Sequence, residues 1–176
     1  MLKPQDCMLL LKLLANPGVE WSQRQLAKTL CISLAEVNAG IKRLTKARLI
    51  VKVNQSQFTP VIQAAEEFLI SGLKYLLPGH LGTYSRGVPT AVGAPIFHNK
   101  IVLSSDPIPV WPDGLGEERG LALMPLYPSV TESLSEFPDK RFYELLVLVD
   151  AIRSGRARER NLAAQLLKEK ISSARK

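Results

Sequence analysis

The chain has 176 residues, of which 46% are hydrophobic and 22% charged, and its formal net charge is +7. This length supports one or two domains with a real core, and the apolar content is that of a globular protein. No apolar run approaches the roughly 20 residues that span a membrane, and no leader segment is recognisable, so we expect a cytoplasmic, nucleoid-associated protein.

The positive charge is concentrated in two segments. Residues 22–58 carry seven Lys or Arg and one acidic residue, and residues 153–176 carry eight and two. Between them, residues 59–152 carry six basic and eleven acidic residues. This asymmetry indicates an anionic partner for part of the surface, although a solvated basic face without a partner also explains it.

Two helix starts lie close together near the N-terminus. Ser22 is followed three residues later by Gln25, and Ser33 is followed three residues later by Glu36. Each pair is a capping box, in which the serine and the Gln or Glu satisfy free N–H groups of a first helical turn. The sequence therefore predicts a helix that stops, turns and restarts within a few residues.

Apolar spacing completes this N-terminal region. A helix is predicted over 4–15, a second over 22–30 and a third over 33–47. Residues 48–61 then favour a short hairpin with a polar tip. Gly40, in the middle of the third helix, implies close packing or a close approach of another backbone, and we favour close packing, because glycine there costs about 1 kcal/mol relative to alanine.

The rest of the chain divides by composition. Residues 61–77 predict a connecting helix with a weak point at Gly72. Residues 78–128 hold eight of the twelve prolines and seven of the eleven glycines. We therefore expect residues 78–135 to form turns and short extended pieces packed on helices. Two C-terminal helices within 136–176, broken at 154–155, complete a mainly α chain with small β elements, of the α+β class.

Three helices followed by a hairpin are the order of a winged helix-turn-helix. Residues 26–50 resemble the MarR-like winged-helix family of bacterial transcription regulators, and the resemblance covers residues 4–60. The residues that fit its pattern are Leu26, Ala27, Leu30, Ile32, Ser33, Val37, Ile41, Lys42, Arg43, Leu44, Leu49 and Ile50. Arg48 departs from it, because the family usually has glycine there, which puts the left-handed turn into the wing in doubt.

The resemblance implies a sequence-specific regulator of transcription, most simply a repressor, with the helix over 33–47 in the major groove of duplex DNA. Basic side chains opposite the apolar stripe would neutralise phosphates, and an amide would pair with a base edge. The expected DNA-binding residues are Gln23, Ser33, Asn38, Lys42, Arg43, Lys46, Arg48, Lys52, Asn54 and Gln57. The alternative is a winged helix that docks a protein and has no primary role on DNA.

The C-terminal region is expected to serve dimerisation, effector binding or partner binding. Small winged-helix regulators usually bind DNA as dimers, so a homodimer is expected. The segment from Pro125 to Leu167 faintly resembles regulators and antitoxins that accompany nucleotidyltransferase-like toxins, which makes such a protein an alternative partner.

Two further stretches have two interpretations each. The run over 153–160 is either a second phosphate or partner surface, formed by Arg153, Arg156, Arg158 and Arg160, or an ordinary solvated helix junction. Residues 84–97 form either a ligand loop or a packed structural loop. The sequence shows no nucleophile–base order, no glycine-rich phosphate loop and no metal-ligand spacing, so we expect no enzyme, cofactor or metal.

Overall fold

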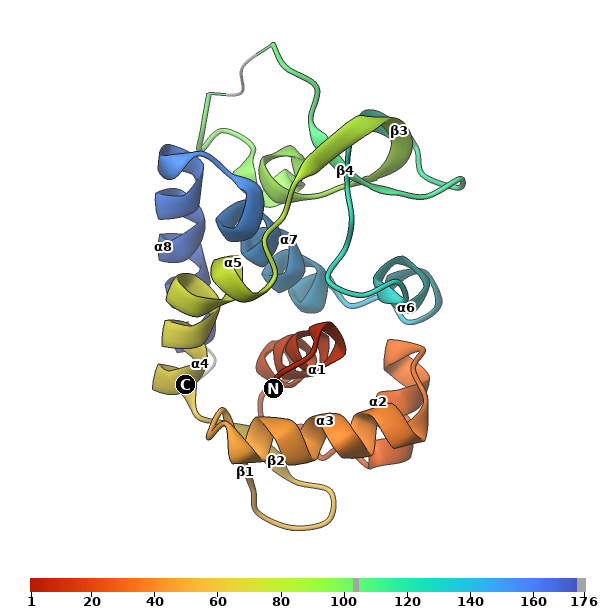
Figure 1. The fold of residues 1–176 in the computed structure, drawn as a ribbon, viewed down its shortest axis with the longest axis vertical. Coiled ribbons are helices and arrows are strands. Elements are labelled where there is room, and N and C mark those ends of the chain that lie inside the picture. The colour runs from red at the N-terminus through yellow and green to blue at the C-terminus, as the bar shows by residue number, and fades with distance from the viewer. Residues whose placement is uncertain (103–104, 174–176) are drawn as a thin grey trace.

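The computed structural model describes residues 1–102 and 105–173 and begins with three helices and a hairpin (Figure 1). The helices are α1 (Pro4–Ala15), α2 (Gln23–Leu30) and α3 (Leu34–Lys46). The hairpin pairs β1 (Ile50–Lys52) antiparallel with β2 (Phe58–Pro60). The elements predicted over 4–60 are therefore present, in the predicted order.

Local signals set the helix ends in this region. Ser22 Oγ accepts from the Gln25 N–H and Ser33 Oγ accepts from the Glu36 N–H, each over 3.1 Å, and both capping boxes close in return. After α3 the chain turns through Arg48, whose φ is +60°. The left-handed turn that the arginine put in doubt is made, in a region that non-glycine residues seldom adopt.

α1 lies at the centre of the molecule and contacts α3 on one side and α7 (Lys140–Ser154) on the other. Every residue from Asp6 to Ala15 is buried, as a helix packed on more than one side requires. Gly40 of α3 faces α1, where a Cβ would lie 2.9 Å from Asp6 Oδ1. The predicted close packing at Gly40 is confirmed.

The predicted connecting helix is divided into three pieces. α4 (Ile62–Glu67) runs into a π-helical segment (Phe68–Gly72) and then into α5 (Leu73–Leu76). The irregularity ends at Gly72, the weak point of the prediction. The buried residues of the three pieces, Ala65, Leu69 and Leu73, recur every four residues.

The Pro/Gly-rich region is more regular than predicted. β3 (Leu81–Pro89), β4 (Pro109–Pro112) and β5 (Glu118–Leu123) pair with one another to close a small barrel, in which β4 and β5 run parallel. The expectation of short extended pieces is wrong for β3, which has nine residues. A Cβ at Gly87 would collide with the Trp111 carbonyl and one at Gly120 with the Ile108 carbonyl, so these glycines permit close strand approach.

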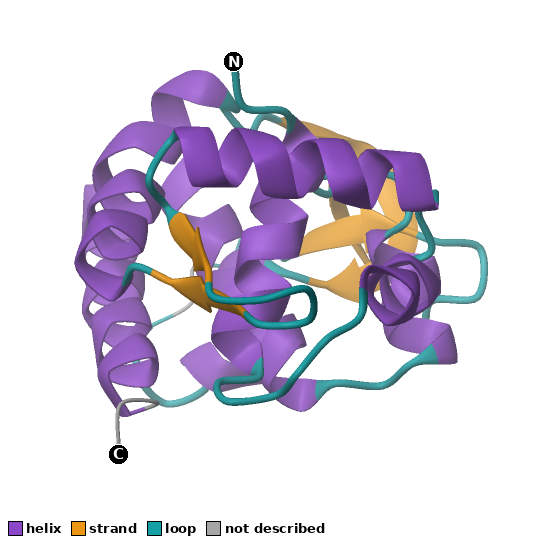
Figure 2. Ribbon diagram, turned by 90° about the horizontal axis from the view of Figure 1, so that it is seen from below, coloured by secondary structure: helices purple, strands orange, loops and turns teal. Residues whose placement is uncertain are grey.

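Helices complete the chain. α6 (Val130–Glu136) lies largely in residues expected to be irregular, and its Ser133 hydroxyl donates to the Thr29 carbonyl at the end of α2. α7 and α8 (Ala157–Ser173) are the two predicted C-terminal helices, with the predicted break between them. The two sheets lie apart with helices between them (Figure 2), and one hydrophobic cluster extends through the chain.

The described part of the chain is thus of the α+β class, mainly helical with two small sheets. Within residues 1–102 and 105–173, no helix combines the length and apolar character needed to cross a membrane.

Candidate nucleic-acid interface

A shallow groove crosses the outer side of α3. It is bounded by the start of α2 and by β1, and its lining residues are Gln23, Asn38, Ile41, Lys42, Thr45, Lys46 and Lys52. Five of these are predicted DNA-binding residues, so the fold brings together side chains from three elements that are up to 29 positions apart, from Gln23 to Lys52.

Helical periodicity explains why α3 presents this surface. Val37, Gly40, Ile41 and Leu44 are buried, whereas Asn38, Lys42 and Lys46 recur at intervals of four on the exposed side. No ion pair involves Lys42, Lys46 or Lys52 in the described parts of the chain. These three ammonium groups are therefore available to an external anion.

Arg43 lies next to this groove but faces inward. Its Nε and Nη2 donate to the Asp6 carboxylate over 2.7 and 2.8 Å, and 23% of its side chain is exposed. The hydrogen bond to Asp6 raises the pKa of Arg43. Arg43, which was predicted to contact phosphate, has its guanidinium bonded instead to a buried aspartate between α1 and α3, whose charge it compensates.

The start of α3 carries a carboxylate rather than a free anion site. Ser33 is bonded to Glu36 through its hydroxyl and its N–H, so it is not free to hold a phosphate as predicted. The Tyr127 hydroxyl donates to Glu36 Oε1 over 2.8 Å, which lowers the pKa of Glu36 and raises that of Tyr127. The first cationic side chain of α3, Lys42, comes eight residues after Leu34, about two helical turns from the helix start.

The remaining predicted residues lie at the hairpin. Arg48 is exposed between α3 and β1. Asn54 accepts from the Ser56 N–H over 3.0 Å and donates to Gln57 over 3.2 Å at the hairpin tip. These side chains order the tip and lie outside the groove lining.

The second predicted basic surface is only partly exposed. Only 5% of the Arg153 side chain is accessible, and its guanidinium donates to Asp150 and to the carbonyls of Leu77 and Met124. Its assignment to a surface is corrected, because its guanidinium joins separate segments internally. Arg156, Arg158 and Arg160 lie toward solvent, and Arg156 is paired with Asp106 at 3.7 Å.

The buried centre around Asp150 escaped the sequence analysis. Its carboxylate also accepts from Thr90 Oγ1 over 2.7 Å and from Trp111 Nε1 over 2.6 Å. Burial raises the pKa of Asp150, and the Arg153 charge and the hydrogen bonds from Thr90 and Trp111 work to lower it. The signal for this site was an aspartate within the apolar run of α7, since buried carboxylates are usually paired.

The chain has two cysteines, and both are free thiols. Cys7 is buried, which raises the pKa of its thiol to about 12, and neither Cys7 nor Cys31 forms a disulfide. In the part of the chain that the structure describes, no three His, Cys, Asp or Glu residues gather as metal ligands would.

Comparison with protein-family models, with curated proteins and with solved structures gives no match.

Proposed function

We propose that residues 4–60 are a winged helix-turn-helix that binds duplex DNA, and that the protein is a sequence-specific transcription regulator, most simply a repressor. The observation that carries the proposal is the groove in which Lys42, Lys46 and Lys52 meet two amide side chains. The order of α1, α2, α3 and the hairpin supports it.

The chemistry of the groove suits a nucleic-acid backbone and a base edge. Lysine ammonium groups on α3 and β1 can neutralise phosphates on both sides of the helix and release counterions. Asn38 is exposed one turn before Lys42 on the same side of α3, and an amide can pair with the N6 and N7 atoms of adenine. Arg43 supports this surface by holding α3 against α1 and does not touch DNA.

A homodimer is part of the proposal, because two half-sites supply affinity and specificity. The apolar side of α8 packs against α7 and α4 within the chain, so it cannot also form the dimer contact. Sedimentation equilibrium of the purified protein tests this point: a mass near 39 kDa, twice the 19.5 kDa of one chain, is expected, and a monomer at all concentrations would contradict it.

The central experiment compares DNA binding by the native protein with that by Lys42→Glu/Lys46→Glu. The probes are duplex DNA from upstream of its own gene and random duplex of equal length, across a salt series. We expect the variant to bind about a hundredfold more weakly. Its salt slope should fall by about 0.9 for each phosphate that the variant no longer neutralises.

The matched control is Lys140→Glu/Arg141→Glu at the start of α7. It makes the same change in net charge on a helix that α1 separates from α3. We expect this control to retain most of the affinity. Equal losses in both double variants, or equally weak native binding to both duplexes, would contradict a dedicated DNA surface.

Protein docking is the second candidate, and the hairpin supports it. Val51 on β1 and Val53 just after it are 52% and 59% exposed, and neighbouring exposed apolar side chains can form part of a protein contact. In this case the partner would be a nucleotidyltransferase-like protein. Val51→Ser/Val53→Ser should then abolish co-purification of that partner, whereas under the DNA proposal it leaves duplex affinity within about threefold of native.

A further inference from the structure

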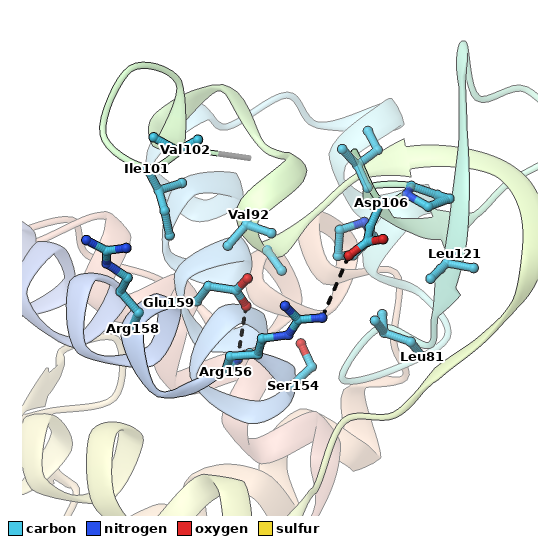
Figure 3. A pocket seen from close by; sticks show the side chains of 15 residues that line it. Leu81, Val92, Ile101, Val102, Asp106, Leu121, Ser154, Arg156, Arg158 and Glu159 are labelled. Carbon is cyan, nitrogen blue, oxygen red and sulfur yellow. Dashed lines mark hydrogen bonds and ion pairs between the residues drawn. The ribbon is translucent and has the colours of Figure 1, made fainter. Parts of the chain in front are cut away.

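A cavity of about 530 Å³ lies between the strand barrel and the turn that joins α7 to α8 (Figure 3). Apolar side chains from four separate segments line one part of it: Val92, Ile101, Ile108 and Leu121. This volume is within the range of small-molecule sites in proteins. The cavity is far along the chain from the α3 groove and shares no lining residue with it.

The cavity joins the two stretches that had two interpretations in sequence. Ala91 and Val92 belong to the loop over 84–97, and the residues from Ser154 to Arg156 belong to the basic run over 153–160. A packed loop and a solvated helix junction would account for each stretch alone. Neither of these two interpretations explains why both stretches line the same cavity, together with residues of the strands.

Charged groups occupy one side of the cavity. They are Arg156 and Arg158 at the start of α8, Glu159 one turn along, and Asp106 on the facing loop (Figure 3). Glu159 accepts from the Arg156 N–H over 3.0 Å, so its carboxylate is used in the helix start. The α8 wall therefore carries two guanidinium groups and one carboxylate, a net charge of +1, and the carboxylate is fixed at the helix start.

The guanidinium of Arg156 is only weakly held by its own chain. Its ion pair with Asp106 spans 3.7 Å, longer than a hydrogen bond, and 81% of its side chain is exposed. An exposed pair of this kind is weak, whereas a bidentate guanidinium–carboxylate pair is strong. An anion that entered the cavity would therefore gain a better contact than the one it perturbs.

We propose that this cavity binds a small organic anion with an apolar body. The acidic group is held by Arg156, and the body packs on Val92, Ile108 and Leu121. A carboxylate and a phosphate ester share the necessary chemistry. This site is independent of DNA binding, so either proposal can fail without the other.

The test uses a matched pair of fluorescent probes. 1-Anilinonaphthalene-8-sulfonate has an apolar aromatic body with one anionic group, and N-phenyl-1-naphthylamine has the same body without the charge. We expect the native protein to bind one molecule of the anionic probe, and Arg156→Gln to weaken that binding about tenfold. The affinity for the neutral probe should not change in this variant.

Two further variants separate the cavity from general charge and surface effects. Arg160→Gln removes the same charge from the same part of α8 outside the cavity lining and should bind the anionic probe as the native protein does. Val92→Phe fills the cavity and should weaken both probes, with thermal unfolding as the check on folding.

Three results would overturn the proposal: equal weakening by Arg156→Gln and Arg160→Gln, equal native affinity for both probes, or no saturable binding at one site. Displacement of the bound probe by benzoate or by phenyl phosphate then distinguishes a carboxylate ligand from a phosphate ester.

Discussion

The N-terminal and C-terminal regions each contain a buried aspartate paired with an arginine, but the two pairs have different surroundings. Asp6 and Arg43 join α1 to α3, and part of the arginine remains in contact with solvent. Asp150 and Arg153 are 2% and 5% exposed, and together they bind Thr90, Trp111 and two backbone carbonyls. The first pair orients one helix, whereas the second holds several segments together.

The two buried aspartates have different roles in their regions of the molecule. In the N-terminal region the Asp6–Arg43 pair leaves the neighbouring Lys42 and Lys46 free on the outer side of α3. In the C-terminal region the aspartate connects α7 to the loop after β3 and to β4. Removing the second pair should therefore affect stability more than removing the first.

The largest expected effect is that of Asp150→Ala. This change leaves the Arg153 guanidinium buried without its counter-charge and Thr90 and Trp111 without their acceptor. We expect the free energy of unfolding to fall by about 3–5 kcal/mol, measured by urea denaturation. Glu136→Ala, at an exposed position, is the control. A decrease below about 1 kcal/mol would mean that the network is not a stabilising centre.

Arg43→Gln compared with Lys42→Gln tests the first pair. Removal of the Arg43 guanidinium leaves the Asp6 carboxylate buried and uncompensated, so we expect a decrease of about 2 kcal/mol in unfolding free energy. Lys42→Gln should leave stability within about 0.5 kcal/mol of native and weaken DNA binding instead. Urea denaturation measures the unfolding free energy of both variants, and duplex titration measures their affinity for DNA. Equal unfolding free energies for the two variants would contradict the role of Arg43 in compensating the buried Asp6 carboxylate.

A smaller effect is expected for Gly40→Ala at the same interface. The added Cβ would lie 2.9 Å from Asp6 Oδ1 and 3.3 Å from Leu9 Cδ2, so α3 must shift against α1. Overpacking of this kind costs about 1–3 kcal/mol, and the better helix propensity of alanine recovers about 1. We expect a net decrease of about 1 kcal/mol by urea denaturation. Gly114→Ala, where a Cβ meets no atom within 4 Å, is the control.

Features that depend on near neighbours in the chain were predictable from sequence. The capping boxes at Ser22 and Ser33 are confirmed because hydroxyl, amide and carboxylate groups three residues apart decide a helix start locally. The break after Ser154 is confirmed for the same reason. The polar stripe of α3 follows from helical periodicity, so the groove residues on that helix could be identified in advance.

Features that depend on distant partners were not predictable. The glycine content of residues 78–128 favoured turns and short extended pieces, but Gly87 and Gly120 lie in strands where another backbone approaches closely. Arg43 and Arg153 were both assigned to the surface, and each turns inward because an aspartate is buried beside it. The useful signal was the acid rather than the arginine: Asp6 and Asp150 border or interrupt apolar runs, where a lone carboxylate would be costly.

The hydrogen bond between Tyr127 and Glu36 joins the two regions near the surface, in contrast to both buried pairs. Tyr127→Phe removes a donor that lowers the pKa of Glu36. A carboxyl with a lowered folded-state pKa stabilises the fold above its ordinary value, 4.5, and that contribution disappears as the pH falls through the folded-state pKa. The native protein should therefore be slightly more stable than the variant at pH 7, and the difference should vanish well below pH 4.5.

Urea denaturation of both proteins between pH 7 and pH 3 measures this difference, and Tyr84→Phe, at an exposed tyrosine, is the control. The same hydrogen bond raises the pKa of Tyr127, and burial raises the pKa of Tyr143 to about 12. One late-titrating tyrosine should therefore be lost in Tyr127→Phe while that of Tyr143 remains, and Tyr127 should titrate earlier in Glu36→Gln. A stability difference that stays constant with pH would show that Tyr127 acts through packing. The two regions would then be joined by apolar contacts rather than by the carboxylate at the start of α3.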